Sequence, residues 1–159
     1  MPDMLVRLWK LDYSEFRRKE ANITKTTGIR FLRVLSPNFK KVEAFIKNEF
    51  SEGWASETTA SFYNDPVSCF IAVDAKNEIL GFACYNATGK SFFGPTGVVK
   101  KMRGQGIGSV LLWRCLESLW EQGFAYAIIG AVGPADYYAK AVGATVIEDS
   151  SPGIYCRCV

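Results

Sequence analysis

The chain of 159 residues contains no histidine. This absence excludes every catalytic triad that depends on an imidazole base, and it excludes most zinc sites, in which histidine is a common ligand. The five cysteines include no C-x-x-C pair, and their odd number argues against a disulfide framework. We therefore expect reduced and mostly buried thiols, no bound metal and a cytoplasmic protein.

The net charge is also small, and the chain has no long apolar run. The formal charge is only +3 and the basic residues occur in short clusters, which does not suit a nucleic-acid-binding surface. No stretch approaches the roughly 20 apolar residues of a membrane-spanning helix. The first residues include Asp3 and lack the apolar run of a signal peptide. We expect neither nucleic acid nor a membrane as a partner.

The composition is that of a globular protein, with 48% apolar and 14% aromatic residues. The length suits one domain, residues 1–159. Residues 1–28 form an N-terminal extension whose secondary structure the sequence does not decide. Apolar periodicity predicts an α/β order. The expected strands are 4–11, 29–35, 67–74, 79–86, 94–100, 124–130, 144–148 and 154–159, and the expected helices are 36–50, 51–63, 107–122 and 135–142. The short turn between strands 67–74 and 79–86 predicts an antiparallel hairpin.

The most informative stretch is residues 92–122, which reads as a strand, a glycine-rich turn and a long helix. The turn is Arg103-Gly104-Gln105-Gly106-Ile107-Gly108. Glycines at alternate positions let a ligand approach the backbone and permit a positive φ. The first N–H groups of a helix have no intrahelical partner, and they lie at the positive end of the helix dipole. The stretch therefore predicts a site for phosphate or pyrophosphate.

Two common phosphate-binding motifs do not fit this chain. A Walker loop that ends at Gly89-Lys90-Ser91 would begin at Cys84 instead of glycine. The dinucleotide fingerprint G-x-G-x-x-G has Ser109 at its third glycine when it starts at Gly104, and Leu111 when it starts at Gly106. A nucleotide-hydrolysing enzyme is therefore disfavoured.

The turn does match R-x-x-G-x-G, at Arg103, Gly106 and Gly108, with Val98 five residues before the arginine. This pattern resembles the acetyl-CoA loop of the GNAT family of N-acetyltransferases, and the resemblance covers roughly residues 29–148. It implies an α/β fold with a mixed, mostly antiparallel central sheet flanked by helices. It also implies that acetyl-CoA is the cosubstrate. The residues implied to bind it are Val98, Arg103, Gly104, Gln105, Gly106, Ile107, Gly108 and Ser109.

A second element of the resemblance is the segment 137–144, which is similar to the family's F-Y-x-K-x-G-F. It has one extra residue before Gly143, and Ala144 replaces the final phenylalanine. The alignment implies that Tyr138 is the acid that protonates the CoA thiolate, and that Tyr137 is a packing aromatic. A phenol with a pKa of about 10 suits that task. The extra residue leaves open which of the two tyrosines faces the sulfur.

The general base is not identified, because residues 91–99, in and before the expected central strand, include no carboxylate, whereas many relatives carry a glutamate in that strand. Residues 130–134 also lack the asparagine of many relatives. Glu57 and Asp136 are candidate bases. Glu57 shares a helical face with Trp54 in the segment that helps to form the acceptor pocket in the family. The alternative is that Glu57 is a solvated surface carboxylate.

The resemblance implies transfer of an acetyl group from acetyl-CoA to the primary amine of a small molecule, by direct attack and without a metal. Two alternatives stay open: an acyl-CoA-binding module without turnover, and a protein or peptide N-acetyltransferase. The expected strand 154–159 could pair within its own sheet or with a second copy of the chain, as in a homodimer.

Overall fold

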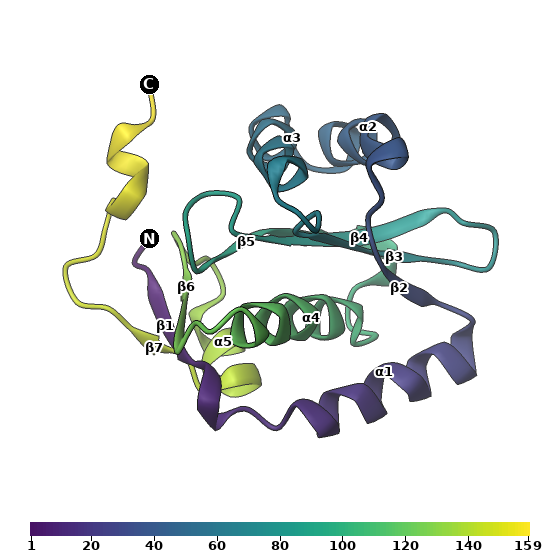
Figure 1. The fold of residues 1–159 in the computed structure, drawn as a ribbon, viewed down its shortest axis with the longest axis horizontal. Helices are drawn as coiled ribbons and strands as arrows, with labels where there is room; N and C mark the ends of the chain where they lie inside the picture. The colour runs from purple at the N-terminus through teal and green to yellow at the C-terminus, as the bar shows by residue number, and fades with distance from the viewer.

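A seven-stranded sheet forms the centre of the computed structural model, which describes residues 1–159 (Figure 1). The strand order is β2-β3-β4-β5-β6-β1-β7, and every neighbouring pair is antiparallel except β5 and β6. The strands are β1 Met4–Arg7, β2 Arg30–Arg33, β3 Cys69–Val73, β4 Ile79–Tyr85, β5 Phe92–Val98, β6 Tyr126–Ile129 and β7 Thr145–Val146. The predicted mixed, mostly antiparallel sheet is confirmed, and so is the hairpin, which is formed by β3 and β4.

Helices cover both faces of the sheet. In Figure 1, α2 (Phe39–Glu49) and α3 (Glu52–Thr59) lie above it, while α4 (Ile107–Glu121) and α1 (Tyr13–Thr27) lie below it. A fifth helix, α5 (Ala135–Val142), lies beside β6 and β1. Because both faces are covered, every residue of β3 and β4 is buried, and the core divides into a larger cluster around α4 and a smaller one under α2 and α3. No helix combines the length and the apolar character that crossing a membrane requires.

Helix α1 comes from the segment whose structure the sequence leaves open. It begins where the Asp12 carboxylate accepts the N–H groups of Ser14 and Glu15, and it ends at Gly28, whose φ is +75°. None of its residues is buried, which explains why its apolar signal is weak. Partly buried residues such as Phe16, which stacks on Trp113, pack α1 against α4, and the Arg114 guanidinium of α4 donates two hydrogen bonds to the Glu20 carboxylate.

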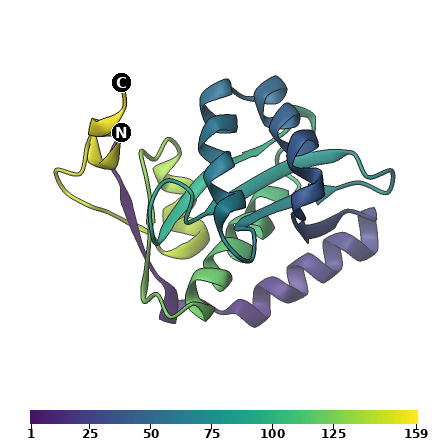
Figure 2. The same ribbon diagram turned by 45° about the horizontal axis from the view of Figure 1, so that its top comes forward.

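Strand β1 occupies the position between β6 and β7, so the N-terminal residues lie inside the sheet rather than at its edge. Figure 2 shows both chain ends on the same side of the molecule, and the Met1 ammonium donates to Ser151 Oγ at 3.4 Å.

The prediction of a final strand at residues 154–159 is wrong. The chain forms a 3-10 helix there, Gly153–Arg157, after a β7 of only two residues. β1 takes the inner position between β6 and β7, and the chain turns away from the outer edge of β7 at Gly153, whose φ of +61° is not that of a strand.

The parallel strands β5 and β6 stay together only briefly. Their paired residues are Phe92 with Ile128 and Phe93 with Ile129, after which β6 ends while β5 continues to Val98. The two strands therefore separate toward their carboxyl ends.

Gly97 of β5 allows close packing of α2 and α3 on the sheet. A Cβ atom added at Gly97 would lie 2.5 Å from Phe50 Cε1 and 2.6 Å from Phe50 Cζ. The Phe50 ring is also held by its neighbours Trp54 and Phe82, with ring centroids 5.6 and 5.5 Å away. Phe50 consequently lies directly on the backbone of β5.

We expect Gly97→Ala to lower the free energy of unfolding by about 1–3 kcal/mol, because the added methyl group overpacks the site and displaces the Phe50 ring. Urea denaturation monitored by circular dichroism measures this change. Gly53→Ala is the matched control: Gly53 is helical and an added Cβ meets no atom closer than 3.9 Å, so it should stabilise by up to about 1 kcal/mol. Equal effects of the two substitutions would contradict the packing argument.

Candidate functional site

The glycine turn brings a set of unpaired N–H groups to the end of β5. Gly106 is the residue before α4, and its φ of +84° is a conformation that glycine adopts readily. None of the backbone N–H groups of residues 104–109 donates to a backbone carbonyl or to a side chain. These groups lie at the positive end of the α4 dipole, so the arrangement suits an anion such as a pyrophosphate.

Val98 turns its backbone polar groups away from β4. Val99 N–H donates to Leu80 O at 2.9 Å, and in an antiparallel ladder the adjacent residue directs its N–H and C=O to the opposite side. That side of β5 is the one from which β6 has separated. The Arg103 Nε–H donates to Val98 O at 3.1 Å and joins the turn to the strand. The Val98 N–H remains available to a ligand.

A cleft with a volume of about 1440 Å³ opens where β5 and β6 separate. Ligand pockets are typically about 300–1,000 Å³, so this cleft has room for more than one small molecule. Its walls come from α3, β5, the glycine turn, residues 130–134, α5 and the C-terminal 3-10 helix. The predicted site residues that line it are Glu57, Val98, Arg103, Gly104, Gly106, Ile107, Gly108, Ser109 and Tyr138. Gln105 and the alternative base Asp136 do not line it.

The two tyrosines of α5 have different surroundings. Tyr138 is buried, and its ring packs edge to face on Phe93 of β5, with the centroids 6.3 Å apart. Tyr137 is 39% exposed, and its hydroxyl lies 2.9 Å from Ser109 Oγ in the first turn of α4. Burial, followed by the neighbouring Tyr137, raises the pKa of Tyr138 to about 12. The Tyr138 hydroxyl is therefore protonated at neutral pH.

Glu57 faces the cleft from α3 and is held by two hydroxyl groups. Its Oε1 accepts hydrogen bonds from Tyr155 Oη, at 3.1 Å, and from Thr88 Oγ1. Both bonds go to the same oxygen, which leaves Oε2 free to meet a bound molecule. Burial, followed by the negative charge of Glu57, raises the pKa of Tyr155 to about 12, so this phenol remains a hydrogen-bond donor.

The loop 130–134, which lines the cleft beside Tyr138, is anchored by the N-terminal strand. Asp3 is buried, and its Oδ1 accepts the Ala131 N–H at 2.8 Å. The Val132 N–H donates to Pro2 O at 2.9 Å, and Ile147 N–H donates to Asp3 O at 2.9 Å. Residues at the start of the chain thus determine the shape of one wall of the cleft.

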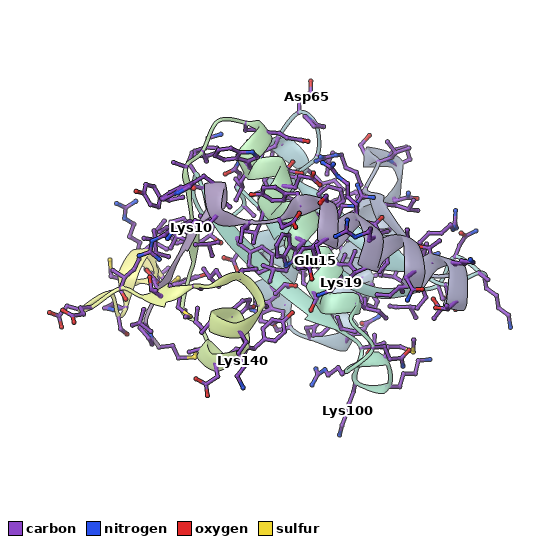
Figure 3. The ribbon with its side chains drawn as sticks, turned by 90° about the horizontal axis from the view of Figure 1, so that it is seen from below. Lys10, Glu15, Lys19, Asp65, Lys100 and Lys140 are labelled. Atoms are coloured by element: carbon purple, nitrogen blue, oxygen red, sulfur yellow. The ribbon has the colours of Figure 1, made fainter.

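Positive charge gathers at one edge of the molecule. Figure 3 shows the Lys100 and Lys140 side chains extending outward at the same edge, Lys100 from the 3-10 turn after β5 and Lys140 from α5. Lys101 and Arg103 lie in the same turn and are also exposed. The charge at this edge favours an anionic ligand at the glycine turn.

Sequence reasoning missed Thr88 and Tyr155, the two partners of Glu57. Thr88 lies in the turn between β4 and β5, and Tyr155 lies 98 residues after Glu57. No local pattern marks either residue, because each role arises only from a contact between distant segments.

Comparisons with solved structures show the same fold. The glucosamine N-acetyltransferase region, described as GCN5-related, of a fungal multi-domain GH3 β-N-acetylglucosaminidase matches with a TM-score of 0.72 at 18% identity, over 92% of this chain and 19% of that one. A GCN5-related N-acetyltransferase from Sphaerobacter thermophilus gives 0.65 at 19% identity, over 92% and 48%. A GNAT family acetyltransferase from Brucella melitensis, in complex with acetyl-CoA, gives 0.54 at 16% identity, over 70% and 80%.

The chain thus spans about a fifth of the fungal protein and about half of the Sphaerobacter protein. No curated protein matches its sequence. The model of the acetyltransferase (GNAT) family matches residues 39–143, which include α2 to α5 and the glycine turn. A family match over more than half of the chain, together with the shared fold and the cleft between β5 and β6, shows that this protein belongs to the GNAT family of acetyltransferases.

Proposed function

We propose that the protein transfers an acetyl group from acetyl-CoA to a primary amine of a small molecule by direct attack. The observation that carries the proposal is the cleft itself, which joins the unpaired N–H groups at the start of α4, the buried Tyr138 hydroxyl and the Glu57 carboxylate. The similar fold of the Brucella protein, which holds acetyl-CoA, supports the choice of cosubstrate.

In this proposal the cosubstrate lies along β5. The N–H groups of residues 104–109 bind the pyrophosphate, and the Val98 backbone pairs with the pantetheine arm. A backbone N–H near Val98 polarises the thioester carbonyl, since a donor placed where negative charge develops stabilises the transition state. Arg103 holds the turn in place through its bond to Val98 O.

The chemistry then needs one base and one acid. Glu57 accepts a proton from the ammonium group, and the neutral amine nitrogen forms a bond to the acetyl carbon. The C–S bond breaks, and Tyr138 donates its proton to the departing sulfur. The second amine proton restores the phenol, directly or through water, so the products are the amide and CoA with a free thiol. The raised pKa of Tyr138 keeps this acid protonated until it is needed.

Gly108→Trp tests the cosubstrate site. Gly108 lines the cleft with an ordinary helical φ, so an indole there fills the site without backbone strain. We expect the affinity for acetyl-CoA to fall at least roughly tenfold in calorimetric titration. Glu121→Trp, at the exposed far end of the same helix, should bind as tightly as the wild type. Failure of the well-folded wild type to bind acetyl-CoA would refute the proposal, whereas binding without turnover on any amine would favour a non-catalytic acyl-CoA-binding module.

Tyr138→Phe tests the acid. The substitution keeps the ring packed on Phe93 and removes only the hydroxyl, so we expect kcat to fall roughly 100-fold with little change in the KM for acetyl-CoA. Release of the CoA thiol, followed with a thiol reagent, measures turnover. Tyr137→Phe is the control and should lower kcat less than tenfold. A larger loss in Tyr137→Phe than in Tyr138→Phe would transfer the role to Tyr137.

Glu57→Gln tests the base through its dependence on pH. A primary amine has a pKa of about 10, so at pH 7 it is almost entirely protonated and needs a base. We expect kcat/KM for the amine to fall about 100-fold at pH 7, and the difference from the wild type to shrink as the pH approaches 10 and the amine loses its proton unaided. A defect that stays constant between pH 7 and 10 would show that Glu57 is not the base.

A further inference from the structure

The end of the cleft around Glu57 has aromatic walls. Trp54 lies one helical turn from Glu57 on α3, is 39% exposed and lines the cleft. Phe50 lies beside it with the ring centroids 5.6 Å apart, and Phe50 rests on the backbone of Gly97 in β5. This wall places two aromatic rings next to the strand along which the thioester is proposed to lie.

Tyr155 forms the facing wall. Its ring packs at the end of β6, where a Cβ atom added at Gly130 would lie 3.3 Å from Tyr155 Cε2. Its hydroxyl donates to Glu57 Oε1 at 3.1 Å. The C-terminal 3-10 helix and α3 therefore line the same end of the cleft, and the Glu57 carboxylate lies where they meet.

Glu57 gives the cleft one anionic group with which a cation can pair. Glu57 is the only acidic residue that lines it, and Arg103 and Arg157 are the only basic side chains that do. Arg103 belongs to the glycine turn, Arg157 is an exposed residue of the C-terminal 3-10 helix, and Met1, which carries the N-terminal ammonium, also lines the cleft. An ammonium group at Glu57 is further favoured by the neighbouring rings, since aromatic faces attract cations.

We propose that the acceptor is an arylalkylamine, a primary amine carried on a flat aromatic group, with its ammonium at Glu57 and its ring between Trp54, Phe50 and Tyr155. This inference rests on the proposed acetyl transfer and names the substrate class of that site. An amino sugar would leave hydroxyl groups without partners against these apolar walls. A polyamine would bring two or more charges to a place that holds a single carboxylate.

The inference is tested by comparing acceptors at a fixed saturating concentration of acetyl-CoA. The probes are 2-phenylethylamine, ethylamine, spermidine and D-glucosamine, and the readout is kcat/KM from release of the CoA thiol. We expect 2-phenylethylamine to exceed ethylamine at least tenfold, because the two share the ammonium and differ only in the ring. A preference for spermidine or glucosamine, or equal values for the first two amines, would overturn the inference.

Two variants, each assayed with two amines, test where the aromatic ring of the acceptor binds. Trp54→Ala should raise the KM for 2-phenylethylamine about tenfold and leave that for ethylamine unchanged, as expected for the loss of one aromatic contact. Trp120→Ala is the matched control, because Trp120 is 42% exposed on α4 and does not line the cleft. Equal losses for both amines, or the same loss in Trp120→Ala, would contradict the assignment. Calorimetric titration of 2-phenylethylamine into the protein with CoA bound measures the same difference without turnover.

The two levels of proposal fail in different ways. Acetylation of a different amine class, with acetyl-CoA bound normally, would remove the arylalkylamine and leave acetyl transfer intact. Acetyl-CoA binding without acetylation of 2-phenylethylamine or of any other primary amine, at any pH between 7 and 10, would refute both.

Discussion

The separation of β5 from β6 is the constraint on which the site depends. Two adjacent parallel strands need a crossover between them, and α4 is that crossover, so its N-terminus lies close to the carboxyl end of β5. The strands pair at only two positions and then diverge toward the same end. One topological feature thus opens the cleft, exposes the backbone of Val98 and aims the start of α4 at the opening. Ligand sites outside the carboxyl ends of parallel strands follow from this geometry.

The N-terminal strand has a structural consequence for the opposite end of the chain. β1 takes the inner position between β6 and β7, and the last residues do not enter the sheet. They form a 3-10 helix instead, and this helix brings Tyr155 to Glu57. The buried Asp3 of the same region accepts the Ala131 N–H and holds the loop that borders the cleft. The C-terminal 3-10 helix and the loop 130–134, which both border the cleft, therefore lie next to the N-terminal strand.

The two ends of the cleft differ in the groups that a ligand would meet. At the glycine turn the field is positive, from unpaired N–H groups and exposed lysines such as Lys100. At the other end a single carboxylate, Glu57, lies among aromatic rings. A cosubstrate with a charged pyrophosphate and a neutral thioester, and an acceptor with one ammonium, match this division. The neutral phenol of Tyr138 lies in the same cleft, and burial keeps it protonated.

The amino-acid sequence by itself determined the α/β class, the β3–β4 hairpin and the glycine turn before α4, because alternation, helical periodicity and turn residues are local signals. It left α1 open, since no residue of that helix is fully buried and its stability comes from contacts with α4, such as Glu20 with Arg114 and Phe16 with Trp113. Only the tertiary structure decided the place of β1 in the sheet, the 3-10 helix in place of a last strand, and the meeting of Glu57 with Thr88 and Tyr155. These features depend on contacts between segments far apart along the chain, and such contacts leave no local pattern from which they could be predicted.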